Sequence, residues 1–129
     1  MTEETEQKDA LTGAIIGAAI EVHEFLGPGL YESAYSECLA YEMSKRGLKF
    51  EREKPLPVHY KQVKLDLGYK MDFVVEKRVV LEIKSVDKLT GLNQAQLLSY
   101  LKLGGYRHGL LINFNVRLLT EGVKRLVMG

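Results

Sequence analysis

The stretch GYKMDFVVEKRVVLEIKSV, Gly68–Val86, decides how we expect this chain to fold. It reads as two β-strands joined by a short charged turn, because Val, Ile and Phe favour strands. Yet Asp72, Glu82 and Lys84 lie inside these strands. Burying a charged side chain without a partner is costly. The presence of three charged residues in this apolar hairpin therefore needs an explanation.

The predicted hairpin has one apolar face and one face that carries charge, because side chains alternate between faces along a strand. We expect a three-residue turn over 76–78, which places the apolar residues of both strands on one face. These residues are Met71, Phe73, Val75, Val79, Leu81 and Ile83. In this register Asp72 lies opposite Glu82, with their Cβ atoms roughly 4.5–5.5 Å apart. Lys84 then projects on the same face, two residues beyond Glu82.

Two directly opposed carboxylates repel each other, so structure alone does not favour this pair. A divalent cation between them removes the repulsion, since hard cations such as Mg²⁺ take carboxylate oxygens as ligands. Lys84 would then stand beside a metal and a phosphate, where an ammonium can assist a nucleophilic water. The alternative is structural: Glu82 and Lys84 form a surface ion pair, and Asp72 is a solvated acid nearby.

The rest of the chain predicts helices on both sides of this hairpin. We expect residues 1–9 to form a flexible tail and residues 10–129 to form a single domain. Helical periodicity begins at Asp9 and ends before Gly27, and further helices are expected over 30–46 and 92–103. An extended segment precedes the hairpin, where two prolines restrict pairing to an edge. The apolar run 108–114 predicts a buried strand, and residues 116–129 fit either a short helix or a last strand. The order ααβββαβ plus a short terminal element indicates an α/β fold with a mixed sheet flanked by helices.

Composition places the chain among ordinary globular domains. It has 129 residues, of which 46 % are hydrophobic and 27 % charged, and a net charge of +1, which gives no overall attraction to nucleic acid. The single cysteine, Cys38, excludes an internal disulfide and suits a reducing cytoplasm. No apolar run approaches the roughly 20 residues that span a bilayer, and the acidic start MTEETEQKDA lacks the pattern of a secretory signal. We therefore expect a cytoplasmic protein without membrane contact.

Three motifs give the chain a family resemblance. The spacing D-x9-E-x-K, formed by Asp72, Glu82 and Lys84, resembles the signature of the PD-(D/E)XK nuclease superfamily. The segment QLLSY, 96–100, resembles the Q-x3-Y motif that follows the active-site hairpin in its RecB-like branch. GLYESAY, 29–35, is similar to the motif that names the GxxExxY proteins of the same superfamily. The resemblance spans roughly residues 11–127, and it departs from the superfamily name only where Met71 replaces the proline before Asp72.

The resemblance implies a restriction-endonuclease-like core and a role for each matched residue of the hairpin. Asp72 and Glu82 would bind Mg²⁺ or Mn²⁺, with the backbone carbonyl of Ile83 as a third oxygen ligand. Lys84 would be the catalytic lysine. Glu32, in the first turn of its helix, would support a metal or its water, although an acid there also favours the helix dipole without any function.

The same resemblance assigns supporting roles on the later helix. Gln96 and Tyr100 lie one helical turn apart on one face. Gln96 would steady Lys84 or a phosphate, and Tyr100 would pack or form a hydrogen bond near it. Both also fit a plain polar helix edge. Tyr35 of the GLYESAY motif fits core packing better than chemistry.

The function that follows is metal-dependent hydrolysis of phosphodiester bonds by a metal-activated water, with DNA as the expected substrate. The first alternative is a catalytically idle nuclease fold that binds nucleic acid or a protein partner. A second is an enzyme acting on another phosphate compound such as a nucleotide, but the chain has no phosphate-binding glycine loop of the Walker type. The sequence leaves open whether the chain is a monomer or a homodimer.

Overall fold

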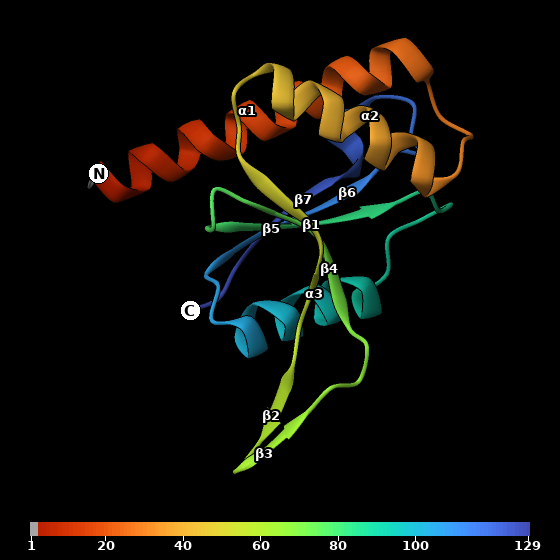
Figure 1. The fold of residues 1–129 in the computed structure, drawn as a ribbon. Coiled ribbons are helices and arrows are strands. Elements are labelled where there is room, and N and C mark those ends of the chain that lie inside the picture. The colour runs from red at the N-terminus through yellow and green to blue at the C-terminus, as the bar shows by residue number, and fades with distance from the viewer. Residues whose placement is uncertain (1–2) are drawn as a thin grey trace.

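A five-stranded mixed sheet forms the centre of the molecule (Figure 1). The computed structural model describes residues 3–129; Met1 and Thr2 lie outside the described residues. The strands follow one another across the sheet as β1 (Phe50–Pro55), β4 (Lys70–Val75), β5 (Val79–Lys84), β6 (His108–Asn113) and β7 (Val123–Val127). β5 and β6 are parallel, while the other neighbours are antiparallel. The predicted mixed sheet of an α/β fold is confirmed.

Helices cover both faces of this sheet. α1 (Glu3–Leu26) and α2 (Glu32–Lys45) pack on one face, and α3 (Gly91–Gly104) packs on the other (Figure 1). The first five residues of β5 are buried, because the strand lies between the two hydrophobic cores. The predicted hairpin is thus the middle of the fold, and its charged side chains are placed between two apolar layers.

The helix boundaries differ from expectation mainly at the N-terminus. α1 begins at Glu3, six residues before the expected start at Asp9, whereas α2 and α3 lie within two residues of their predicted ends. α3 starts with a capping box, in which the Thr90 and Asn93 side chains each accept from the other's backbone N–H. It stops at Gly105, whose left-handed φ of 76° suits glycine. The mobility expected for residues 1–9 stays a prediction.

The extended segment before the hairpin holds more strands than the predicted order allowed. Besides β1, it contains β2 (Val58–Tyr60) and β3 (Val63–Leu65), which pair only with each other among the described residues. The restriction by prolines is confirmed, since β1 is an edge strand and ends at Pro55. At the C-terminus both readings are right: a 3-10 helix, η1 (Leu119–Gly122), precedes β7.

The register of the central hairpin is the predicted one. Val75 pairs with Val79, and the Arg78 N–H donates to the Val75 carbonyl at 3.0 Å across the three-residue turn. The ladder continues through Val74 and Val80 and ends where Phe73 pairs with Leu81. The residue pair beyond this last rung is Asp72 and Glu82.

One residue, Met71, lies on the opposite face of the sheet from the predicted one. Met71 packs in the core against α3, together with Val74, and not with Phe73 in the core against α1 and α2. The alternation of faces breaks at Asp72, because pairing with β5 has ended there. On the other side of β4, Glu53 of β1 has a left-handed φ of 47°, so the pairing with β1 is also irregular at this point.

Candidate active site at the open end of the hairpin

Asp72 and Glu82 meet where the ladder between β4 and β5 stops. The Asp72 N–H donates to Glu82 Oε2 at 2.8 Å, and the Ile83 N–H donates to Asp72 Oδ2 at 2.7 Å. Each carboxylate thus accepts from the backbone of the opposite strand, in place of a carbonyl. The structure brings the two predicted acids together, and their own side chains bridge the opened strands.

Burial makes this acid pair hard to ionise fully. Glu82 is only 5 % exposed, and desolvation raises its pKa to about 8, with the charge of Asp72 as the next cause. The pKa of Asp72 is also raised, again mainly by burial, although the Ile83 N–H and the charge of Lys84 oppose the rise. At neutral pH Glu82 is therefore mainly protonated, and the site carries less negative charge than two carboxylates would give.

Two further charges act on the pair from other positions. Lys84, half-buried at the end of β5, lowers the pKa of both acids, while Glu32 from the first turn of α2 raises both. Among the described residues, Lys84 forms no ion pair within 4 Å with either acid. Lys84 and Glu32 therefore act on Asp72 and Glu82 by longer-range electrostatic interaction and not by a direct salt bridge.

Tyr35 fixes the loop that starts α2. Its hydroxyl donates to the Gly27 carbonyl at 2.6 Å and accepts from the Leu30 N–H at 3.1 Å, and its ring stacks on Phe114 at 4.5 Å. The Leu30 carbonyl also accepts from Ser85 Oγ at 2.5 Å. Tyr35 is fully buried and has a structural role, because its hydrogen bonds hold the turn that precedes Glu32.

The two residues of the later motif meet each other on α3. The Gln96 side-chain amide donates to the Tyr100 hydroxyl at 3.3 Å. Tyr100 is largely buried, and its pKa is raised by burial first and then by the charge of Glu82. The ring of Tyr69 lies 6.0 Å from the Tyr100 ring. The expected action of Gln96 on Lys84 or a phosphate stays a prediction.

Sequence reasoning missed Asn113, which holds the chain just after Lys84. Asn113 is buried, its Oδ1 accepts from the Val86 N–H at 3.0 Å, and its Nδ2 donates to the Val86 carbonyl at 2.9 Å. Next to it, the Phe114 N–H donates to the Lys84 carbonyl at 2.9 Å. The amide inside the apolar run 108–114 was the available signal, because a buried amide needs hydrogen-bond partners.

The acid pair fits a divalent cation. One oxygen of each carboxyl group accepts a backbone N–H, and Asp72 Oδ1 and Glu82 Oε1 would be the hard oxygen ligands once Glu82 has lost its proton. Across the part of the chain that the structure describes, no group of three or more His, Cys, Asp and Glu side chains is close enough to hold a metal. Glu32 thus influences the site by its charge, and a third protein ligand would have to come from backbone.

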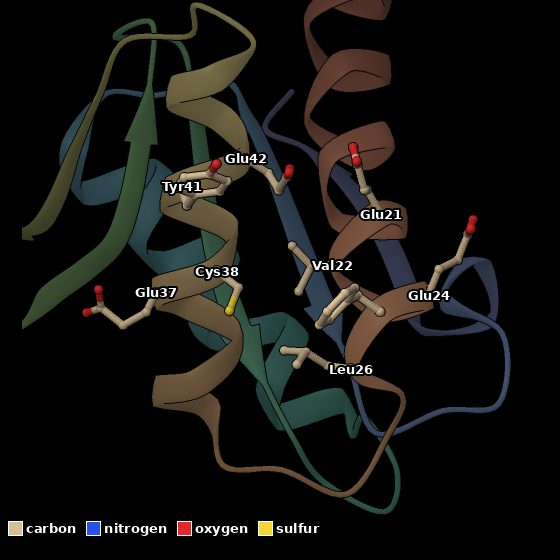
Figure 2. Close-up of a pocket in the computed structure, with 9 residues that line it drawn as sticks. Glu21, Val22, Glu24, Leu26, Glu37, Cys38, Tyr41 and Glu42 are labelled. Atoms are coloured by element: carbon tan, nitrogen blue, oxygen red, sulfur yellow. The ribbon is translucent and has the colours of Figure 1, made fainter.

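A separate groove lies between α1 and α2, on the outer side of the helical layer (Figure 2). It has a volume of about 630 Å³ and a mainly apolar lining. The lining residues are Glu21, Val22, Glu24, Phe25, Leu26, Glu37, Cys38, Tyr41 and Glu42. Neither Asp72 nor Glu82 belongs to it. Glu21 pairs with Arg46 and Glu37 with Arg52, so the groove carries less negative charge than its four glutamates would give.

Comparison with known proteins places the chain in a class. The family model described as the PD-(D/E)XK nuclease superfamily matches residues 9–126. The chain belongs to the PD-(D/E)XK nuclease superfamily, which supports a nuclease-type function on nucleic acid and the use of divalent metals that is general among these nucleases. Neither a curated protein nor a solved structure matches the chain. Within residues 3–129 no helix has the length and apolar character to cross a bilayer.

Proposed function

We propose that this protein is a metal-dependent nuclease that hydrolyses phosphodiester bonds, with DNA as its substrate. The observation that carries the proposal is the buried contact between Asp72 and Glu82, with Lys84 beside it. A folded domain without a ligand there would gain nothing from two desolvated carboxyl groups, one of which, Asp72, raises the pKa of the other. A cation is the partner that makes this arrangement favourable.

The residues of the site divide into ligands and helpers. Asp72, Glu82 and the carbonyl of Ile83 would hold Mg²⁺ or Mn²⁺, which when bound supplies activation of water and neutralisation of phosphate charge. Lys84 keeps its ammonium next to the pair, where it attracts the scissile phosphate and stabilises the negative charge that develops on it. Glu82 must give up its proton before it can serve as a ligand, because only the carboxylate binds a metal well.

The remaining residues position these groups. Glu32 would hold a water by its charge, at a distance that the loop around Tyr35 sets. Tyr100 forms a wall of the site, and Gln96 fixes the direction of its hydroxyl. We further propose that the chain belongs to the GxxExxY branch of the superfamily, since Gly29, Glu32 and Tyr35 occur at that spacing. The hydrogen bonds of Tyr35 support a structural reason for the motif.

Incubation with a panel of single- and double-stranded DNA and RNA tests this function. We expect cleavage of DNA in Mg²⁺ or Mn²⁺ and none in a chelator. Glu82→Gln should abolish cleavage, because the neutral amide is a poor ligand. Glu24→Gln removes an exposed acid of the outer groove and should cut like the parent. If the parent cuts nothing in either metal, the nuclease proposal is wrong and the alternative of an idle binding module is favoured.

A further inference from the structure

The strands β2 and β3 form an arm that projects from the sheet past α3 (Figure 1). We call residues 58–65 the β2–β3 arm. Its base is tied to the body: Leu56 is buried in the α3 core, and its N–H donates to the Tyr69 carbonyl at 2.8 Å. A two-stranded ribbon on its own is marginally stable in water. The arm therefore gives the domain little stability and presents its side chains to a partner.

The two faces of the arm differ in chemistry. Val58 pairs with Leu65 and Tyr60 pairs with Val63, so these four side chains share one face, while His59 and Lys64 share the other. At the tip, Tyr60 is 62 % exposed and Val63 is 54 % exposed. The arm thus shows an aromatic ring to solvent on one side and a cation on the other.

Positive charge is concentrated along this segment. Lys61, Lys64 and Lys70 are all exposed, and the only acid within residues 58–70 is Asp66. Lys61 Nζ lies 5.4 Å from the centre of the Tyr60 ring, so cation and ring form one spot at the tip. A polyanion with flat aromatic groups is the partner whose chemistry matches both.

The backbone at the tip is unfavourable for the residue it carries. Lys61 has a φ of 55°, in the left-handed region where glycine is the favoured residue. Glu76 and Lys77 adopt the same conformation in the turn between β4 and β5, so at Lys61 it marks a tight turn that glycine would also accept.

The arm is joined to the acid pair by the strand that carries Asp72. Lys70 precedes Asp72 by two residues on β4, which is roughly 7 Å along a strand. The ring of Tyr69 lies 6.0 Å from that of Tyr100, whose pKa is raised by burial first and then by the charges of Glu82 and Asp72. A chain bound along the arm would therefore lead directly to the candidate active site.

We propose that the β2–β3 arm binds the nucleic acid that is cut, at a segment with unpaired bases. Lys61 at the tip and Lys70 near the base contact phosphates of the bound strand, and the Tyr60 ring stacks on a base. Unpaired bases are required, because in a duplex both faces of each base are covered by its neighbours. This inference rests on the proposed function, since it makes nucleic acid the substrate of the acid site.

Fluorescence anisotropy with a labelled single-stranded DNA oligonucleotide, in a chelator so that nothing is cut, measures this binding. We expect Tyr60→Ala and Lys61→Gly each to weaken binding about tenfold, the range found when one stacking aromatic is removed. Lys61→Gly should also lower the slope of log affinity against log salt by about 0.7, the value for one phosphate contact on a single strand. Lys61→Gly should melt at the parent's temperature or higher, which excludes unfolding as the cause. Tyr60→Phe keeps the ring and should bind like the parent.

Lys45→Ala and Lys124→Ala are the matched controls, because these exposed lysines lie on α2 and β7, away from the arm. They should bind the oligonucleotide like the parent. Equal binding by the parent, Tyr60→Ala and Lys61→Gly overturns the proposal. So does a loss in Tyr60→Ala that is as large for a blunt duplex as for the single strand, because the ring would then not read unpaired bases.

The two proposals fail in different ways. A parent protein that binds the oligonucleotide through the arm, yet cuts nothing when Mg²⁺ is added, supports the arm and contradicts the nuclease function. If the parent, Tyr60→Ala and Lys61→Gly cut single-stranded DNA equally well, the result supports the nuclease function and contradicts the proposal that the arm binds the substrate.

Discussion

The two ends of the β4–β5 hairpin differ in what holds the strands together. At the turn end, Val75 and Val79 pair through the ladder and are fully buried between apolar neighbours. At the open end, carboxylates of Asp72 and Glu82 replace the carbonyl acceptors, at a desolvation cost that raises their pKa values. One end stabilises the fold, and the other places reactive charge inside it.

Truncating the apolar end should have the largest effect. Leu81 is fully buried and lies one residue before Glu82, on the face toward α1 and α2. Leu81→Ala should lower the free energy of unfolding by about 2–5 kcal/mol, because it leaves a cavity in the core. Urea unfolding followed by circular dichroism measures it. A loss below about 1 kcal/mol would mean that the paired, apolar part of the hairpin does not stabilise the fold.

Removing the cation at the open end should affect catalysis and not the fold. Lys84→Ala should reduce cleavage by roughly 10²-fold or more, the usual scale for a positioned electrostatic group. Metal binding should persist or strengthen, since a neighbouring positive charge is lost. Asp72→Ala is the matched comparison and should lose both metal and cleavage. Undiminished cleavage by Lys84→Ala would remove Lys84 from the active site.

The acid pair should make the metal-free protein less stable as pH rises. Glu82 has a folded pKa of about 8 against an ordinary value of 4.5, so the folded state binds more protons between these values. The free energy of unfolding should therefore fall from about pH 4.5 to pH 8, by at most about 1.4 kcal/mol per pH unit for this one proton. Urea titrations at several pH values measure it. Glu82→Gln should flatten the profile relative to the parent; an unchanged slope would contradict the burial of this acid.

Neutralising the other acid should have the smallest effect on stability. Asp72→Asn relieves the repulsion with Glu82, while its amide oxygen can still accept from the Ile83 N–H. We expect the metal-free variant to match the parent within about 1 kcal/mol, or to be more stable. Asp72→Ala leaves that buried N–H without its acceptor and should cost about 1–3 kcal/mol. Thermal unfolding of both variants in a chelator separates the two outcomes.

The apolar end of the hairpin was predictable and much of the open end was not. Turn length and alternation fix the register from Val75 to Leu81, so the meeting of Asp72 and Glu82 followed from the sequence. The place of Met71 did not follow, because the ladder with β5 ends at Phe73 and the neighbouring β1 is irregular at Glu53, although Met71 still pairs with Lys54. A two-residue loop in the extended segment hid the β2–β3 arm, since Lys61 takes the left-handed turn position where glycine would have been a signal.

The contribution of distant elements was also beyond sequence patterns. Nothing local shows that Tyr35 holds the turn before α2, or that Asn113 holds the chain after Lys84. The Tyr35 hydrogen bonds are local, but its ring stacks on Phe114 and Asn113 bonds to Val86, so both positions depend on how α2 and β6 pack around β5. The motifs named the charged residues, but only the fold shows what positions them.

The central claim is that a divalent metal is the partner of the buried acids. Thermal unfolding of the parent and of Glu82→Gln, with millimolar Mn²⁺ and with a chelator, tests it most directly. The parent should melt several degrees higher with Mn²⁺, because a ligand that binds only the folded state stabilises it by mass action. Glu82→Gln should show no such rise. Equal melting temperatures of the parent with and without the metal would contradict the account.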